Sequence, residues 1–294
     1  MSEDGTPQPG GVEREQAVEA VAAQAQSLGE EEMWDQAHAV LAQALDEHGE
    51  HPLLLCWAGI AAQRLGEQGE AYEMFRRALA LEPQDPFILA SAGSGLAALD
   101  DPEAERALRL AALTAPDFPF ARAAYGEYLA REGLFDDAVA ELEAARRLAP
   151  EDGAVHAELG ITLLLAGRTD DGLDALEEAL SRAPGDSWLR ALFGLALADA
   201  GRGEQGAEVL HQAAAEREDD VEVQLIAALA MAAEGWENPA WEALARAAQA
   251  ADSSDRELIA EVEDCVEAGA DAAAELLRQD LGPSLLRERL LQRA

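Results

Sequence analysis

The feature that most constrains the fold is a series of small residues that returns about every 34 positions. Its members are Ala37, Ala71, Ala104, Ala138, Gly172, Gly206 and Ala240. A second small-residue series runs seven positions later, from Ala44 to Ala247. Large apolar residues such as Leu41 and Phe75 lie between the two series. Spacings of three and four residues place all three series on one face of a helix.

Each unit also carries an upstream helix and a turn. The upstream series consists of Gly59, Gly93, Gly126, Gly160, Gly194 and Ala228. The turn positions are Gly66, Gly133, Gly167, Gly201 and Gly235, with Asp100-Asp101-Pro102 in the third unit. The residues that end the second helices are Pro83, Pro116, Pro150 and Pro184. Each unit is therefore predicted to be a helix, a turn and a helix, with small residues that let the paired helices approach.

The repeat divides the chain into predicted segments. Seven units are expected at 15–51, 52–85, 86–118, 119–152, 153–186, 187–220 and 221–254. The first unit contains three extra residues between Gly29 and Met33. Residues 1–14, rich in Gly, Pro and charge, are predicted to be a disordered tail. Residues 255–294 are predicted to be capping helices, near 256–268, near 270–281 and from Pro283 onward.

Several local motifs match a known repeat family. Small and apolar residues of the fourth to sixth units carry the match, namely Ala138, Leu142, Ala145, Pro150, Leu159-Gly160 and Phe193-Gly194. In this pattern the sequence resembles the tetratricopeptide repeat family. The resemblance implies an all-α fold, a right-handed α-solenoid superhelix of helix-turn-helix repeats. The early Trp of the family is replaced here by Leu55, Leu89, Arg122, His156, Arg190 and Gln224.

The composition is strongly acidic. The 21 basic residues are all Arg, and 59 Asp and Glu residues give a net charge of −38. Such a chain repels phosphate backbones and anionic lipids, which excludes nucleic acid and membrane surfaces as expected partners. With no long apolar run and an acidic N-terminal sequence, a cytoplasmic protein is expected. Salt adaptation, a GC-rich genome and a basic partner are alternative explanations for the acidity.

The sequence offers no catalytic motif, so we expect no enzyme, no cofactor and no metal. His48 and His51 are three positions apart and, with Glu47 or Glu50, form the one metal-binding candidate. Metal sites usually need three or four ligands, which favours an exposed polar turn instead. The two cysteines, Cys56 and Cys265, are predicted to be buried, reduced thiols.

By resemblance, the first helix of each unit lines a concave groove, and most groove positions here are apolar. The candidate partner-binding residues are Leu53, Ile60, Arg64, Phe87, Phe120, Arg131, Ile161, Leu164, Leu165, Trp188, Leu195, Leu225 and Leu229. An exposed apolar surface of this extent usually marks a binding site. The alternative is that these residues are buried against neighbouring units or against the tail of the chain.

The residue types narrow the expected partner. Members of the family often bind extended peptides through Asn, or terminal carboxylates through Lys and Arg, yet this chain has one Asn, Asn238, and no Lys. An apolar groove with an acidic rim suits an amphipathic, basic helix or peptide. The leading hypothesis is a non-enzymatic protein-protein interaction scaffold, as a monomer or weak homo-oligomer. The alternative is a dedicated chaperone or regulatory subunit that shields one aggregation-prone client.

The C-terminal segment from Pro283 has the features expected of such a partner. Leu286 and Leu290 are four positions apart and form an apolar stripe. Three Arg residues against Glu288 give the segment a side-chain charge of +2. The segment is either a final helix that caps the last repeat or a helix that docks in an apolar groove, its own or that of a neighbouring molecule.

Overall fold

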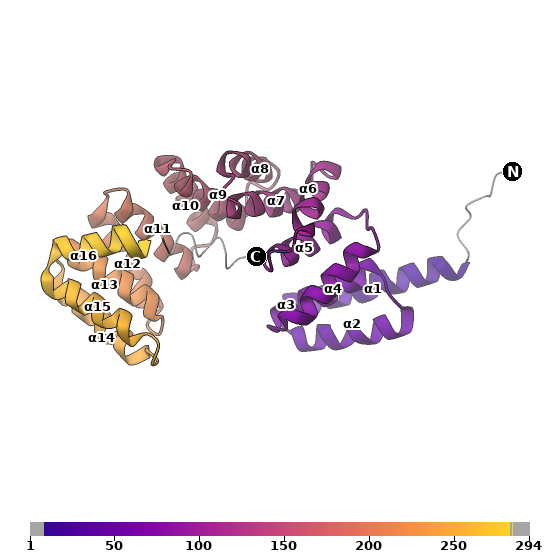
Figure 1. The fold of residues 1–294 in the computed structure, drawn as a ribbon, viewed down its shortest axis with the longest axis horizontal. Helices are drawn as coiled ribbons and strands as arrows, with labels where there is room; N and C mark the ends of the chain where they lie inside the picture. The colour runs from indigo at the N-terminus through magenta and orange to yellow at the C-terminus, as the bar shows by residue number, and fades with distance from the viewer. Residues whose placement is uncertain (1–8, 283, 285–294) are drawn as a thin grey trace. The chain divides into compact units, whose positions relative to one another are not determined.

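The computed structural model describes residues 9–282 and 284, and all elements within that part of the chain are helical. The chain divides into two compact units, Met1–Tyr128 and Leu129–Arg293, and the division falls within one helix. Consecutive helices of each unit pack in antiparallel pairs (Figure 1). The predicted all-α solenoid of helix-turn-helix repeats is confirmed.

From Pro9 to Tyr128, the described part of unit 1 contains six complete helices and most of a seventh. Its helices are α1 (Pro9–Glu30), α2 (Trp34–His48), α3 (Pro52–Arg64), α4 (Gln68–Ala80), α5 (Pro86–Ala97), α6 (Glu103–Thr114) and α7 (Pro119–Arg131). The first helices of successive repeats also contact one another. Helix α3 packs against both α1 and α5. These helices form the inner layer of the unit.

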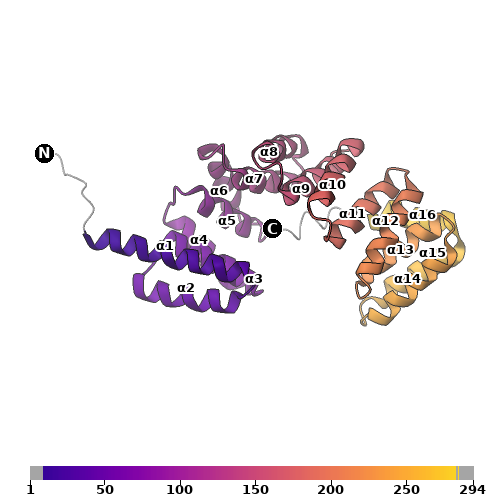
Figure 2. The same ribbon diagram turned by 180° about the vertical axis from the view of Figure 1, so that it is seen from behind.

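Unit 2 contains the remaining repeats and the C-terminal helices. Its helices are α8 (Phe135–Leu148), α9 (Gly153–Leu165), α10 (Thr169–Arg182), α11 (Ser187–Asp199), α12 (Gly203–Glu216), α13 (Val221–Ala233), α14 (Glu237–Ala250), α15 (Arg256–Ala268) and α16 (Ala270–Leu276). A π-helical segment, Leu277–Leu281, continues α16. Helix α16 packs against both α15 and α13 (Figure 2).

The two ends of the chain differ from the sequence prediction in part. Helix α1 begins at Pro9, so the predicted disordered tail is wrong for residues 9–14. Proline suits the first position of a helix, and good helix formers follow the two glycines. Helix α15 coincides with the expected helix at 256–268, whereas the expected helix at 270–281 changes to π-helical geometry at Leu277. The expected last helix lies outside the described residues, except for Ser284, which is helical.

In unit 2 the paired helices approach at glycines. A Cβ atom on Gly160 would lie 2.8 Å from Leu176 Cγ and 3.1 Å from the carbonyl oxygen of Gly172. A Cβ atom on Gly172 would in turn lie 3.0 Å from the Gly160 carbonyl oxygen. In the next repeat, a Cβ atom on Gly206 would lie 2.7 Å from the Gly194 carbonyl oxygen. Backbone therefore meets backbone within these helix pairs.

In unit 1 the corresponding space holds an aromatic ring. Phe75 of α4 is 1% exposed and lies between α3 and α5. A Cβ atom on Gly59 would be 2.6 Å from this ring, and one on Gly95 would be 2.1 Å from it. The two glycines provide the volume that a phenylalanine requires where most other repeats carry leucine.

Aspartates cap most of the inner helices. The Asp85 carboxylate accepts hydrogen bonds from two backbone N–H groups at the start of α5, and Asp152 does the same at α9. Asp186 and Asp220 each accept one at α11 and α13. These caps satisfy N–H groups that have no partner within the helix, each contributing about 1 kcal/mol.

The turn of the third repeat replaces glycine with two aspartates. Asp100 adopts a positive φ of 54°, a conformation that Asp tolerates better than most residues. The side chain of Asp101 accepts hydrogen bonds of 2.8 Å from the Glu103 N–H and of 2.8 Å from the Tyr72 hydroxyl. Burial favours a higher pKa for Asp101, but these hydrogen bonds and the nearby Arg76 hold the pKa below its ordinary value. The turn is thereby tied to the preceding repeat.

Polar residues at the position of the family Trp have a common role. Three of them bond to a proline carbonyl six residues earlier, with Arg122 bonding to Pro116, His156 to Pro150 and Arg190 to Pro184. Gln224, which is fully buried, donates to the carbonyls of Ala214, near the end of α12, and of Arg217, which follows that helix. These side chains satisfy backbone carbonyls between consecutive repeats.

Replacing Gly160 with Ala is expected to destabilise the protein by about 1–3 kcal/mol, because the added methyl group must displace Leu176 and the Gly172 backbone. The matched control is Gly69→Ala, since no atom lies within 4 Å of a Cβ at this helical glycine. This change should be neutral or stabilising by up to about 1 kcal/mol. Chemical denaturation of the two variants measures the difference. Equal stabilities would show that the helices do not depend on this contact.

Candidate partner-binding site

A row of aromatic side chains crosses the inner helices of unit 1. The ring of Trp57 on α3 lies 5.5 Å from that of Phe87 on α5, centroid to centroid. Phe87 lies 6.1 Å from Phe120 on α7, and Phe118 packs edge-on against Phe120 at 5.9 Å. Phe120 is 42% exposed, and Trp57 and Phe87 are half-buried. These four residues, the aromatic row, form a partly exposed apolar surface.

The aromatic row borders a pocket of about 410 Å³ on the same face. Helices α1, α3 and α5 supply its lining, which consists of Glu19, Ala22, Ala23, Gln26, Leu53, Trp57 and Phe87. Small alanines on α1 leave the space open opposite the rings. Glu19 is exposed and is the charged residue of the lining. The pocket therefore combines an apolar wall with a carboxylate at its edge, an arrangement that accepts an apolar group next to a cation.

The structure brings together three of the predicted groove residues of unit 1. Leu53 and Phe87 line the pocket, and Phe120 extends the row. Ile60 is half-buried and packs against the hydrophobic core. The guanidinium of Arg64 lies 5.6 Å from the Trp34 ring centroid, so this side chain packs over a different aromatic residue.

In unit 2 four of the eight predicted groove residues are buried. Ile161, Leu195, Leu225 and Leu229 are each at most 1% exposed. Leu164 is half-buried, and its side chain lies within 3.0 Å of where a Cβ of Gly172 would be, so it packs within its own helix pair.

The remaining predicted residues of unit 2 are partly accessible. Leu165 and Trp188 are half-buried, and the guanidinium of Arg217 lies 5.7 Å from the Trp188 ring centroid. Arg131 is the last residue of α7 and is also half-buried. The predicted surface is therefore not one continuous strip of exposed apolar residues.

Two parts of the unit 1 site were missing from the sequence prediction. Trp57 is not among the predicted groove residues, although its spacing of four from Leu53 places both on one helical face. Glu19 and Gln26 come from the first repeat, where the three extra residues obscured the register. The Leu53–Trp57 spacing was the signal available in the sequence.

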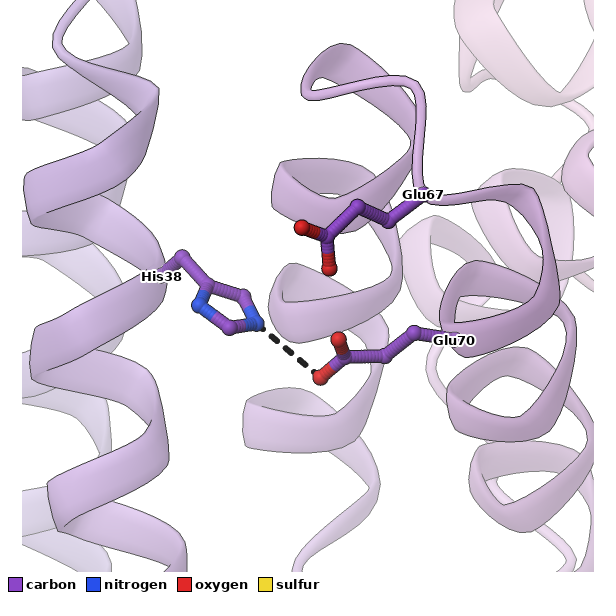
Figure 3. A group of neighbouring side chains, drawn as sticks. All are labelled: His38, Glu67 and Glu70. Carbon is purple, nitrogen blue, oxygen red and sulfur yellow. Dashed lines mark hydrogen bonds and ion pairs between the residues drawn. The ribbon is translucent and has the colours of Figure 1, made fainter.

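One cluster of His and Glu side chains lies at the junction of the first two repeats (Figure 3). His38 of α2 donates a hydrogen bond of 2.9 Å to Glu70 of α4, and Glu67 lies beside them. The three possible ligand atoms are within 4.8 Å of one another. The direct hydrogen bond joins the second helices of the first two repeats, so the contact ties these repeats together.

The other sequence candidates for chemistry have structural roles. His51 accepts a hydrogen bond of 3.2 Å from the Leu53 N–H and caps α3. His48 and His51 do not belong to a group of three possible ligands within the described residues. Burial raises the pKa of Cys56 to about 12, so its thiol stays protonated and unreactive. Cys265 is only partly buried, unlike the prediction.

Comparison with known proteins identifies the family. The tetratricopeptide repeat model matches residues 22–86 and 124–187, and a second model of the same description matches residues 163–232. The chain therefore belongs to the tetratricopeptide repeat family. Proteins of this family bind other proteins or peptides and are generally non-enzymatic, so the fold supports an interaction scaffold. No curated protein sequence matches the chain significantly.

Solved structures share the fold. PilW, a widely conserved type IV pilus biogenesis factor, is 25% identical, with a TM-score of 0.58 over 68% of this chain and 93% of its own. A thermophilic repeat protein from Thermus thermophilus is 25% identical, with a TM-score of 0.51 over 61% of this chain and 98% of its own. A repeat protein from Parabacteroides merdae has a TM-score of 0.59 at 16% identity, over 88% of this chain and 99% of its own.

A helix that crosses a membrane must be both long and apolar. Within residues 9–282, no helix combines the length and the apolar character that crossing a bilayer requires.

Replacing Glu70 with Gln is expected to lower stability at pH 7 by at most about 1 kcal/mol, because the hydrogen-bonded pair of His38 and Glu70 is partly exposed. The hydrogen bond from His38 lowers the pKa of Glu70 in the folded protein. Its contribution is therefore present above the ordinary carboxyl pKa and is lost as the pH falls through the lowered value.

Melting temperatures of the parent and Glu70→Gln between pH 7 and pH 3 measure this contribution. The difference should be largest at pH 7 and should disappear at the acid end. The control is Glu73→Gln, an exposed carboxylate on the same helix, which should melt like the parent. A difference between the parent and Glu70→Gln that persists unchanged at low pH would contradict the assignment.

Proposed function

We propose that the inner face of unit 1 binds an amphipathic, basic helix or peptide of another protein. The observation that carries this proposal is the aromatic row of Trp57, Phe87, Phe120 and Phe118 beside the pocket. Aromatic residues are the commonest anchors of protein interfaces. A partly exposed row of them is unusual on a surface without a partner.

The spacing of the rings fits a helical ligand. The centroid separations along the row are 5.5 Å and 6.1 Å, close to the rise of about 5.4 Å per turn of an α-helix. Apolar side chains at positions i and i+4 of a bound helix are separated by about 5–6 Å. Such a helix lying along the row places one apolar side chain next to each ring, in the manner of other helix-in-groove complexes.

The charge distribution favours a basic ligand. Glu19 lies at the edge of the pocket, and the whole chain has a net charge of −38. A field of this sign accelerates association with a cationic partner, and complementary charges at the rim set its orientation. The same field disfavours an acidic helix with an identical apolar stripe.

A labelled 14-residue synthetic helix with Leu at i, i+3, i+4 and i+7 and Arg on its flanks is the probe. Replacing Phe87 with Ala should weaken its binding about tenfold, because the central ring of the row is lost. Phe120→Ala tests the exposed end of the row without disturbing the core. The control is Leu113→Ala, which truncates a leucine that is 73% exposed on α6. Fluorescence anisotropy gives the dissociation constants.

The control variant should bind the probe like the parent, and a version of the probe with Glu in place of Arg should bind weakly. If Phe87→Ala, Phe120→Ala and Leu113→Ala all bind the Arg probe with the parent affinity, binding is a general attraction of opposite charges. That outcome would remove the aromatic row from the proposed site.

A further inference from the structure

The C-terminal helices lie on the inner face of unit 2. Helix α16 packs against α13, and the π-helical segment Leu277–Leu281 remains in contact with the same helix. Gly282 then lies on the next inner helix, because a Cβ atom on it would be 3.4 Å from Leu195 Cδ1 of α11. The chain therefore passes from α13 to α11 in the direction of α9.

Three apolar residues mark the path across this face. Ile161, Leu195 and Leu229 are 34 residues apart and occupy the same register on α9, α11 and α13. Each is at most 1% exposed. The described chain reaches the second of these three residues at Gly282. Leu165, one helical turn beyond Ile161, is half-buried and gives the next apolar contact on α9.

Residues 283–294 are long enough to reach α9. As a helix, twelve residues span about 18 Å, and neighbouring packed helices are about 8–10 Å apart. Leu286 and Leu290 provide an apolar stripe that matches the apolar row on α9 and α11. The three Arg residues of the segment are complementary in charge to Asp199, which is exposed at the end of α11.

We propose that residues 283–294 occupy the inner face of unit 2 as an internal ligand, with Leu286 and Leu290 against Leu165 and its neighbours on α9. The segment has the chemistry of an amphipathic, basic partner and excludes such a partner from this face. An external helix binds there only after displacing it. The inference does not depend on the site proposed for unit 1.

The experiment uses full-length variants and a labelled peptide that corresponds to residues 283–294. Leu290→Glu places a charge in the apolar stripe and should release the segment. The matched control is Gln292→Glu, the same change in charge on the opposite side of the predicted helix. The peptide should bind the Leu290→Glu chain at least about tenfold more tightly than it binds the parent or the control, because only the released face is free.

A second substitution identifies the bound surface. Adding Leu165→Glu to the Leu290→Glu chain should abolish peptide binding, with helical content checked by circular dichroism. Adding Phe87→Ala should leave the affinity unchanged. If Phe87→Ala abolishes binding and Leu165→Glu does not, the peptide binds unit 1, and this inference fails while the proposed function stands.

Three other outcomes would overturn the inference. Equal peptide affinity for the parent and the Leu290→Glu chain would show that the segment does not occupy the face. A Leu290→Glu chain that melts at a lower temperature and does not bind the peptide would show that the segment is only a cap. A parent dimer that Leu290→Glu converts to a monomer, measured by light scattering, would place the segment in the groove of a neighbouring molecule.

Discussion

The distance between the two helices of a repeat controls the rest of the structure. In unit 2 this distance is set by contact between backbones, where Gly160 faces Gly172 and Gly194 faces Gly206. A methyl group at any of these positions would overlap a carbonyl oxygen or a leucine side chain. Because interiors are close-packed, a wider pair would also shift the inner helix against its neighbours. The register of the inner face, and hence any binding surface on it, depends on these contacts.

The excess of acidic residues is accompanied by a structural use of arginine. Arg122 and Arg190 bond to the carbonyls of Pro116 and Pro184, and Arg77 bonds to Glu50 of the preceding repeat at 2.9 Å. Positive charges are thus engaged in turns and in contacts between helices. Many carboxylates remain exposed, so the field outside the protein is negative. Because arginines are engaged in contacts within the fold while many carboxylates face solvent, the protein can be stably folded and still attract cationic ligands.

The sequence predicted the repeat and the helix pairs because both follow from local spacing. Small residues such as Gly160 and Ala145 indicate where helices pack closely, and every repeat shares this packing. The exposed fraction of a side chain is harder to predict from the sequence, because it depends on segments that are distant along the chain. Leu195 and Leu229 occupy the same register as the half-buried Ile60, yet they are buried because the C-terminal helices lie over the face of unit 2 that carries them. Trp57 and Glu19 were missed because the inner face combines residues from three helices, and one of these belongs to the irregular first repeat.

The contrast between the two inner faces follows from the cost of leaving apolar surface in water. Aliphatic groove residues of unit 2 gain most from being covered, and α16 and the π-helical segment Leu277–Leu281 pack against the inner helix α13. Unit 1 instead presents rings that already pack against one another, as Phe87 does between Trp57 and Phe120. Such rings have few rotatable bonds, and mutual contact restricts these further. These rings therefore lose little side-chain entropy when a ligand binds, which makes a preformed aromatic row a better docking surface than flexible aliphatic residues.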